Sequence, residues 1–361
     1  MKVVWNADNG RYADNPRALH EAWTARGGDG VDHLWLASSR QAATFPPGVA
    51  TVPIGTPQAV AALEAADVLV SNTHIQLDRW RKRPGAVYLQ TWHGTPLKRI
   101  HRDAAFQPPD DVMAELDDDI ARWDLLVTPS AEGTRLLRAA FAYRGRVLET
   151  GYPRNDVLSA PDRAARRARV RAELGLAEGT TAVLYAPTYR DDEAAPGVDA
   201  PLGLDVGALA RRLGDDAVVL LRLHHYMGHQ SRPAGGGRVQ DVGAYPDISD
   251  LYLAADVLVT DYSSSMFDFA VTGKPILVFA YDLAHYRDRL RGFTLDLEAE
   301  APGPVLLDQE ALTAALLDLP AVAAAQAGRY ARFVQRFCAL EDGRASERVL
   351  EALWAEGLPP G

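Results

Sequence analysis

Short apolar runs alternate with segments of helical spacing through most of this chain. Residues 67–71 and 124–128 enclose runs of aliphatic residues, as expected for strands buried on both faces. Between such runs, residues 57–66 repeat apolar side chains at the three- and four-residue intervals of a helix. Strands that alternate with helices in this way form parallel sheets, so the sequence predicts a doubly wound α/β fold.

The alternation occurs twice along the 361 residues, which is enough chain for two domains that each bury a core. The first series predicts strands at residues 3–5, 33–36, 49–54, 67–71, 85–89, 124–128 and 146–149, and helices at 16–26, 57–66, 112–122 and 132–143. The second series predicts strands at residues 182–185, 217–223, 238–242, 256–260 and 275–279. Because turn-forming residues 152–156 separate the series, we predict lobes of residues 1–155 and 156–330, followed by C-terminal helices in residues 331–361.

One loop, residues 90–98 with the sequence Gln-Thr-Trp-His-Gly-Thr-Pro-Leu-Lys, follows a predicted strand directly. Gly94 permits a sharp turn, Pro96 cannot extend a strand ladder, and Thr95 can cap whatever element follows. We therefore expect His93 at the carboxyl edge of a sheet, where open α/β folds bind ligands. The alternative is that His93, beside Trp92, is an ordinary packed turn residue.

A second loop joins the predicted strand at 256–260 to a helical pattern that starts at Met266. A helix amino terminus with free N–H groups and serine hydroxyls can bind a phosphate, whereas capping alone requires a single serine. We expect a diphosphate here. The candidate ligand-binding residues are Thr260, Asp261, Tyr262, Ser263, Ser264 and Asp268, although an aspartate one turn into a helix also serves as a cap partner.

A third motif, Arg-Leu-His-His at residues 222–225, ends a strand in the same half. Strand alternation directs Arg222 and His224 to one face, and two cations on one face can neutralise a diphosphate without a metal ion. A structural histidine is the alternative. No Asp-X-Asp motif follows a predicted strand, so the sequence predicts neither a metal site nor a cofactor.

These motifs and two others occur in the order found in the CDP-glycerol glycerophosphotransferases, which build the poly(glycerol phosphate) chains of teichoic acids and related capsular polymers. The chain resembles this family between residues 80 and 282. The matching segments are residues 90–98, 151–156, 185–190, 221–224 and 260–264, with Phe267 and Asp268.

The resemblance implies the GT-B architecture, with an acceptor lobe at 1–155, a donor lobe at 156–330, a cleft between them, and final helices that cross back to the first lobe. It implies that His93 takes the proton of an acceptor hydroxyl as that oxygen attacks CDP-glycerol and CMP leaves. His224, with Arg222 and Ser264, would stabilise charge on the transferred phosphate. The other implied substrate-binding residues are Trp92, Gly94, Thr95, Thr260, Asp261, Tyr262, Ser263 and Asp268.

Three alternatives stay open at this stage. A transferase for CDP-ribitol would use the same motifs. Another GT-B enzyme, a nucleotide-sugar glycosyltransferase or epimerase, would share the lobes but would not require the loop around His93. A GT-B module that only binds polymer would have no use for a base at that position.

Composition limits the partners. The formal net charge of −10 disfavours nonspecific binding to nucleic acid. Arg79, Arg81, Lys82 and Arg83 form either a patch for an anionic membrane or polymer surface, or a solvated turn; the basic helix at residues 162–174 is expected to be solvated. No signal peptide is evident and residues 311–328 are too interrupted to span a bilayer, so we expect a cytoplasmic protein, peripheral at most on the inner face of the membrane.

Overall fold

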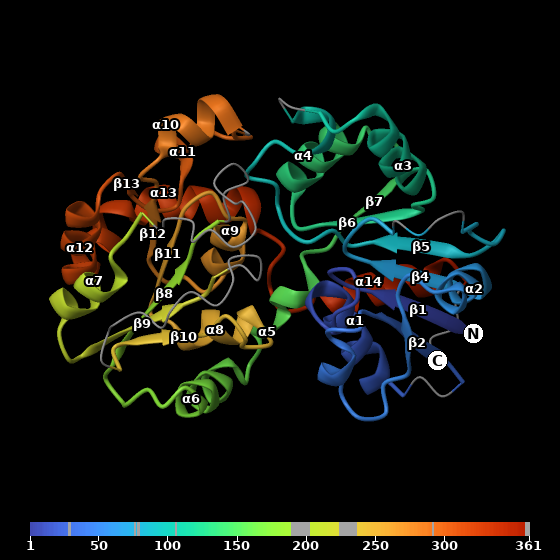
Figure 1. Cartoon of the computed structure of the whole chain (residues 1–361), viewed down its shortest axis with the longest axis horizontal. Helices are drawn as coiled ribbons and strands as arrows, with labels where there is room; N and C mark the ends of the chain where they lie inside the picture. The colour runs from blue at the N-terminus through green and yellow to red at the C-terminus, as the bar shows by residue number, and fades with distance from the viewer. Residues whose placement is uncertain are drawn as a thin grey trace. The chain divides into compact units, whose positions relative to one another are not determined.

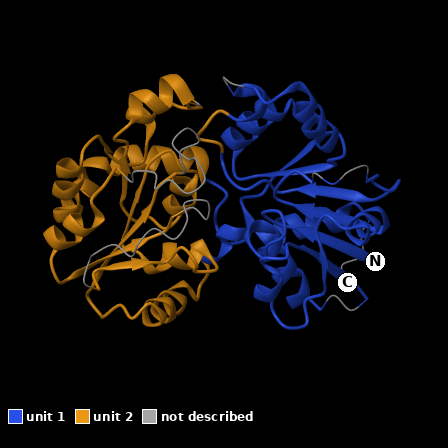
Figure 2. Cartoon of the chain, viewed as in Figure 1, with its two compact units in different colours: residues 1–95, 100–157, 339–361 blue, residues 96–99, 158–338 orange. Residues whose placement is uncertain are grey.

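The computed structural model describes residues 1–27, 30–75, 77, 80–104, 107–188, 203–223, 237–290 and 292–357. The chain forms two compact units (Figures 1 and 2). Unit 1 comprises residues 1–95, 100–157 and 339–361, and unit 2 comprises residues 96–99 and 158–338. The chain therefore passes between the units several times, and its last segment belongs to the first unit from Ala339 onward rather than from residue 331.

Unit 1 is built on a seven-stranded sheet in the order β3-β2-β1-β4-β5-β6-β7, and its neighbouring strands are parallel. The strands are β1 Lys2–Asn6, β2 Asp32–Ala37, β3 Thr51–Pro53, β4 Val68–Ser71, β5 Val87–Gln90, β6 Leu125–Thr128 and β7 Arg146–Glu149. The strand order reverses between β1 and β4. In doubly wound folds, ligands bind beyond the carboxyl ends of the strands at this switch point.

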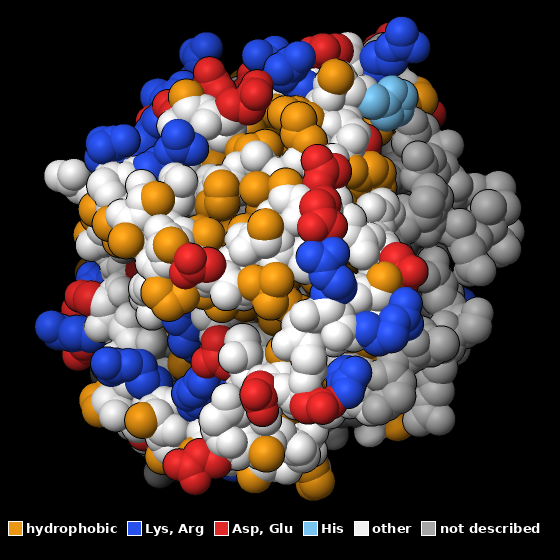
Figure 3. All heavy atoms as spheres, turned by 90° about the vertical axis from the view of Figure 1, so that its left-hand side faces the viewer, with side chains coloured by type: hydrophobic (Ala, Val, Ile, Leu, Met, Phe, Trp, Pro, Cys, Tyr) orange, Lys and Arg blue, Asp and Glu red, His pale blue; other side chains and the backbone are white. Residues whose placement is uncertain are grey.

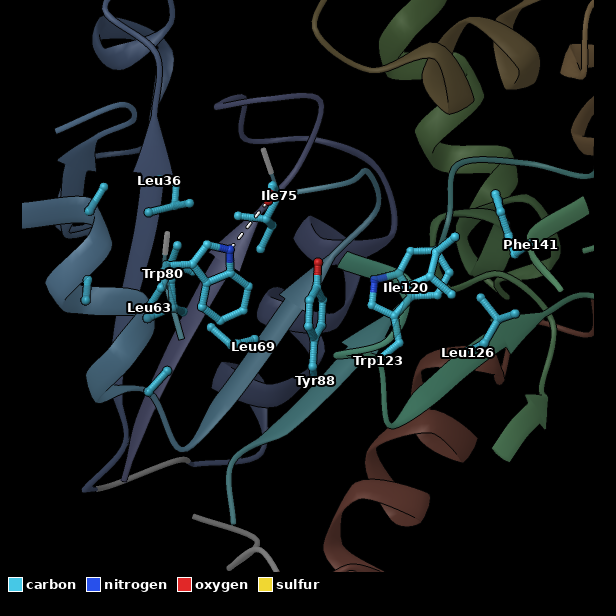
Figure 4. Packing of buried hydrophobic residues seen from close by; sticks show 14 of the residues in the cluster. Leu36, Leu63, Leu69, Ile75, Trp80, Tyr88, Ile120, Trp123, Leu126 and Phe141 are labelled. Carbon is cyan, nitrogen blue, oxygen red and sulfur yellow. Dashed lines mark hydrogen bonds between the residues drawn. The ribbon is translucent and has the colours of Figure 1, made fainter. Parts of the chain in front are cut away.

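Helices cover both faces of this sheet because side chains alternate between faces along each strand. Trp5 of β1 contributes to a core that also contains Leu353, whereas Val4 contributes to the opposite core with Trp80 and Tyr88 (Figure 4). The helices are α1 Asp14–Ala25, α2 Pro57–Ala65, α3 Asp110–Ile120, α4 Ala131–Phe141 and α14 Ala345–Ala355, with short 3-10 turns at Ala42–Thr44, His101–Asp103 and Pro153–Asn155.

Unit 2 repeats the design with a six-stranded parallel sheet in the order β10-β9-β8-β11-β12-β13. Its strands are β8 Thr181–Ala186, β9 Ala217–Leu221, β10 Val239–Asp241, β11 Val257–Thr260, β12 Ile276–Phe279 and β13 Val305–Leu306. Its helices are α6 Arg163–Glu173, α7 Val206–Leu213, α8 Ile248–Ala254, α9 Ser265–Ala270, α10 Leu283–His285, α11 Leu297–Glu300, α12 Gln309–Leu317 and α13 Leu319–Phe337, with a π-helical turn at Tyr286–Leu290. Helix α5, Asp156–Ser159, lies where the chain enters unit 2. The predicted α/β class with two parallel sheets is confirmed.

The basic helix α6 is not simply solvated, which corrects the expectation from sequence. Arg167 donates hydrogen bonds to the last carbonyl groups of α8 and its C-cap, at Leu253, Ala254 and Ala255, over 2.6–2.9 Å. Unpaired carbonyls at a helix C-terminus attract cations because they carry the negative end of the helix dipole. Arg171 bonds to the same region. These arginines attach α6 to α8 rather than facing a lipid or a polymer.

Two of the basic residues before β5, Lys82 and Arg83, also make hydrogen bonds within the protein. Lys82 Nζ donates to the carbonyl oxygen of Arg122 at 2.8 Å and to Asp124, while Arg83 pairs with Asp67. Trp80 is buried in the core. Arg79 lies outside the described residues.

Among the described residues, no single helix is both long and apolar enough to cross a bilayer; α12 and α13 meet that criterion only together, across a bend of 99°. Leu307, just before α12, is 56% exposed, and Leu317, the last residue of α12, is 57% exposed. Figure 3 shows the face of unit 2 on the α7 and α12 side, where apolar surface is interrupted by basic and acidic side chains.

Candidate active site

Three loops at the carboxyl edge of the unit 1 sheet carry the polar residues of the site. They follow β1, β4 and β5, which are neighbours in the sheet. Asp8 lies in the first loop, Asn72 in the second and His93 in the third. The predicted position of His93 beyond the end of a strand is confirmed.

A backbone carbonyl fixes the orientation of His93. Its Nδ1 lies 2.8 Å from the carbonyl oxygen of Asn72, so Nδ1–H is the donor and Nε2 is left as the basic nitrogen. The ring packs on Trp92 with 4.1 Å between centroids, and the side chain keeps open surface. This tautomer presents a lone pair to a ligand, as a general base requires.

Asn72 connects the histidine to Asp8. The side chain of Asn72 accepts a hydrogen bond from Asp8 N at 2.9 Å and donates one to Asp8 Oδ1 at 3.1 Å. A single residue therefore holds Asp8 through its amide and His93 through its carbonyl oxygen.

A second set of contacts holds the His93 loop from the start of α1. Asn15 Nδ2 donates to the carbonyl oxygen of Trp92 at 3.0 Å, and Asn15 Oδ1 accepts from Arg154 N at 3.1 Å. Arg154 Nη1 in turn pairs with Asp14 at 2.8 Å. The turn at residues 152–156, predicted as a linker, thus supplies an arginine to the surroundings of His93.

The backbone is strained around this site. Asp8, Asn9, Asp14 and Trp92 have positive φ angles of 45°, 55°, 60° and 51°, respectively, a region that L-residues other than glycine rarely adopt. Gly94 has a φ of 145°, which explains the glycine after His93. Residues in such conformations concentrate at functional sites, because the surrounding contacts must hold them there.

Opposing effects set the charge of His93. Burial lowers its pKa from the ordinary value, whereas Asp8 and Asp14 raise it and Arg154 lowers it. For Asp8, burial and the nearby charge of Asp14 both raise the pKa of the carboxyl group. A neutral imidazole beside two carboxylates can accept a proton, and the carboxylates then stabilise the imidazolium.

Asp8, Asp14, Asn15, Asn72 and Arg154 were not identified from the sequence. The available signal was their position, since Asp8 and Asn72 follow two predicted strands at the edge where ligands bind. Thr95 is buried, and no helix directly follows it. Residues 96–99 instead join unit 2, where Thr294 N donates to the carbonyl oxygen of Leu97 at 2.8 Å.

The corresponding switch point in unit 2 lies between β8 and β11. Asp261, directly after β11, accepts hydrogen bonds from Thr188 N at 2.8 Å and from Tyr262 N at 2.6 Å. Thr260 is buried and donates to the carbonyl oxygen of Ala186 at 2.7 Å. These predicted site residues connect the two loops at the strand ends.

The serines differ in their roles. Ser263 Oγ accepts a hydrogen bond from Ser265 N at 3.2 Å and lies 3.0 Å from Ser265 Oγ, so Ser263 caps the first turn of α9. The N-cap residue Ser264 makes no side-chain capping bond. Both Ser263 and Ser264 keep some exposed surface. The hydroxyl of Ser264 is therefore the one that the described fold does not use for capping.

Arg222 and Tyr262, two further predicted donor-site residues, make contacts within the protein. Arg222 Nη1 donates to the carbonyl oxygens of Val242, Gly243 and Tyr245 at 2.5–3.0 Å, so this arginine orders the loop after β10. Tyr262 is fully buried, and its hydroxyl donates to Asp282 at 2.8 Å.

Asp268 is buried within α9. His224 lies outside the described residues. The described part of the chain holds no cluster of three or more histidine, cysteine, aspartate or glutamate side chains that is suited to a metal ion.

Comparison with known proteins agrees with this architecture. The family model described as CDP-glycerol:poly(glycerophosphate) glycerophosphotransferase matches residues 1–355. A teichoic acid glycerol-phosphate transferase of Staphylococcus aureus is 37% identical over 356 residues, covering 95% of this chain and 90% of that protein. A teichoic acid poly(glycerol phosphate) polymerase of Bacillus subtilis is 33% identical over 98% of this chain, which spans about half (48%) of that longer protein.

Among solved structures, the wall teichoic acid polymerase TagF superposes with a TM-score of 0.90 at 30% identity, covering 98% of this chain and 89% of that one. One TagF structure is of a variant soaked with CDPG. A UDP-GlcNAc 2-epimerase from Neisseria meningitidis has a TM-score of 0.58 at 14% identity and so shares the fold alone. The predicted GT-B-like fold and the predicted resemblance are confirmed. The chain belongs to the CDP-glycerol:poly(glycerophosphate) glycerophosphotransferase family.

Proposed function

We propose that this protein transfers glycerol phosphate from CDP-glycerol to a terminal hydroxyl of a poly(glycerol phosphate) or glycan-linked acceptor and releases CMP. The observation that carries the proposal is His93, whose Nδ1–H is bound by a carbonyl group while its Nε2 is left to act as a base. The test is a CMP-release assay with CDP-glycerol, CDP-ribitol and UDP-sugars, each with and without a glycerol-phosphate acceptor. Release that depends on both CDP-glycerol and the acceptor supports the proposal.

In this mechanism His93 Nε2 takes the proton from the acceptor hydroxyl. The oxygen forms a bond to the phosphorus that carries glycerol, and the bond from that phosphorus to the CMP oxygen breaks. The charge that develops on His93 is stabilised by Asp8 and Asp14, which lower the barrier without touching the substrate.

A CDP-ribitol donor is the nearest alternative. Ribitol-phosphate polymerases of Staphylococcus aureus are also relatives, but they are 29% identical over only 58% of this chain. Glycerol is therefore the donor alditol that we propose, and the CDP-ribitol arm of the assay tests it directly.

For the donor, we propose that Ser264 and His224 bind the diphosphate. The support is that the Ser264 hydroxyl makes no capping hydrogen bond to α9, together with the family motifs. Ser264→Ala and His224→Ala should each lower kcat/KM about ten- to a hundredfold, because a hydrogen bond to a charged group contributes roughly 1.5–3 kcal/mol. Transfer kinetics and CDP-glycerol calorimetry measure this. If both variants keep wild-type turnover and affinity, the donor phosphates bind elsewhere.

Transfer should also proceed without a divalent metal. The proposal rests on histidine, serine and helix N–H groups as the partners of the donor phosphates. Treatment with EDTA should leave CMP release within about twofold of the untreated rate, since no step is assigned to a metal. Activity that EDTA abolishes and magnesium restores would overturn this part of the mechanism.

We propose, separately, a peripheral association with an anionic membrane surface on the inner face of the cell membrane. Lys82 and Arg83 are already paired with carboxylates. The proposal therefore concerns Arg81 together with Arg79, which lies outside the described residues. Vesicle binding should therefore be weak, about 1 kcal/mol per basic residue, and should decrease with salt. Binding that is unchanged in the Arg79→Ser/Arg81→Ser variant assigns this stretch to a turn alone.

A further inference from the structure

A second histidine, His74, lies at the same edge of the unit 1 sheet and is held by a buried carboxylate. Asp119, in the last turn of α3, is only 1% exposed, yet it is surrounded by hydrogen-bond donors. Its Oδ2 lies 3.1 Å from His74 Nδ1 and 3.0 Å from Trp123 Nε1, and Tyr88 donates to its Oδ1 at 3.4 Å. A buried charge requires such partners.

This arrangement fixes which nitrogen of His74 faces outward. A carboxylate only accepts hydrogen bonds, so Nδ1–H of His74 donates to Asp119 and Nε2 carries the lone pair of the neutral ring. The His74 side chain is 12% exposed, whereas that of its partner is 1% exposed. Within the described residues Nε2 has no hydrogen-bond partner. A partly exposed imidazole that is oriented by a buried carboxylate resembles a ligand-binding group more than a core residue.

His74 and His93 both contact Trp92. The indole of Trp92 packs against His93 at 4.1 Å and meets His74 edge-on at 5.6 Å between centroids. His74 also stacks on Trp123 at 5.4 Å, and Phe141 packs against Trp92 and Trp123 (Figure 4 shows Trp123, Phe141 and Tyr88). The two histidine rings thus pack against the same indole within a single unit.

We propose that His74, positioned by Asp119, binds the second hydroxyl of the acceptor's terminal glycerol while His93 takes the proton from the attacking one. The inference rests on the proposed glycerol phosphate transfer. A terminal glycerol presents two adjacent hydroxyls, and each histidine offers one nitrogen that accepts a hydrogen bond. Two such acceptors hold the glycerol in one orientation, which places the attacking oxygen in line with the phosphorus.

Nearby His101 provides a matched comparison. Its ring stacks on His74 at 6.0 Å, and its Nδ1–H donates to the carbonyl oxygen of Ala140 at 3.0 Å. Its Nε2, however, is buried, 3.9 Å from Asp117. His101 belongs to the same cluster but has no nitrogen available to a substrate.

The test compares His74→Asn with His101→Asn on two acceptors. In each variant the asparagine amide can keep the hydrogen bond made by Nδ1, while Nε2 is lost. One acceptor ends in glycerol phosphate, and the other ends in propane-1,3-diol phosphate, which lacks the secondary hydroxyl. Tryptophan fluorescence during thermal unfolding reports on folding of unit 1, since all seven tryptophans lie in its segments.

We expect His74→Asn to lower kcat/KM for the glycerol acceptor by about five- to fiftyfold, as for a lost hydrogen bond and orientation. The same variant should act on the propanediol acceptor within about twofold of wild type. His101→Asn should leave the ratio between the two acceptors unchanged. Equal losses on both acceptors, or no loss on either, overturn the role of His74.

Failure of the proposed function itself looks different. In that case the wild-type protein releases no CMP from CDP-glycerol with either acceptor, so no ratio exists to compare. If folding is lost in His74→Asn, His74→Phe supplies the same comparison, because it keeps a ring to pack on Trp123 but has no Nε2. An unchanged ratio in that variant refutes the proposal.

Discussion

The variant His93→Ala should lose about 10²–10⁴-fold in transfer rate, the usual effect of removing a general base. Donor binding should change little, because the residues proposed to bind CDP-glycerol belong to unit 2 and His93 belongs to unit 1. The loss should therefore appear in kcat rather than in the KM for the donor. Transfer kinetics and calorimetry on the same folded preparation measure both quantities.

Two outcomes would contradict this role. Near wild-type turnover in His93→Ala would make His93 a packed turn residue. A loss of CDP-glycerol affinity as large as the loss of rate would make it a phosphate ligand instead of the base.

The pH dependence follows from the same assignment. Burial lowers the pKa of His93, so the neutral base persists below the ordinary histidine pKa of about 6.5. Transfer should stay constant as pH falls from about 8 toward 6.5 and should decline only when pH passes below the lowered pKa. An acid limb centred above 6.5 in wild type would show that another group is the base.

The variant Gly10→Ala should unfold unit 1 more easily by about 2–5 kcal/mol and should also reduce transfer. Gly10 follows Asp8 and Asn9, has a φ of 103°, and a Cβ there would overlap the backbone nitrogen of Ser38. The expected cost combines an unfavourable backbone conformation with overpacking against a backbone atom. Because the loop must shift, Asp8 should move away from Asn72.

Gly27→Ala is the matched control. Gly27 also has a positive φ, of 79°, but no neighbouring atom of the described residues lies within 4 Å of its added Cβ. It should cost about 1 kcal/mol, from backbone conformation alone, and leave transfer unchanged. Urea unfolding followed by tryptophan fluorescence compares the two variants in unit 1. Equal destabilisation by both would show that the contact between Gly10 and Ser38 is unimportant.

Most strands were predictable because buried parallel strands have a strong local signature. Strand β4 was expected at residues 67–71 and forms at Val68–Ser71. Strand β13, Val305–Leu306, was missed because two residues after a proline carry no periodic signal. The position of His93 was predictable for a related reason, since an apolar run precedes it and Gly94 and Pro96, directly after it, favour a loop.

The partners of His93 were not predictable, because they depend on contacts between distant segments. Asn72 and Arg154 are 21 and 61 positions from His93 in the sequence, and no local pattern links them. Arg222 shows the opposite error. Alternation placed it at the correct edge of the sheet, yet three carbonyl groups after β10 bind its guanidinium. The sequence indicates where in the fold a residue lies, whereas the contacts of its side chain depend on the tertiary structure.

The C-terminal helix α14 affects how this protein is made. Val349, Leu350 and Leu353 are fully buried in the core that contains Trp5 and Trp23, near the beginning of the chain. Burial of each side chain is worth about 1.5–3 kcal/mol. On the ribosome, unit 1 therefore lacks part of its core until residues 345–355 emerge, after all of unit 2 has been synthesised. The N-terminal domain of a chain usually folds first. Here the unit that carries His93, the proposed base, can complete its core only after unit 2 has been synthesised.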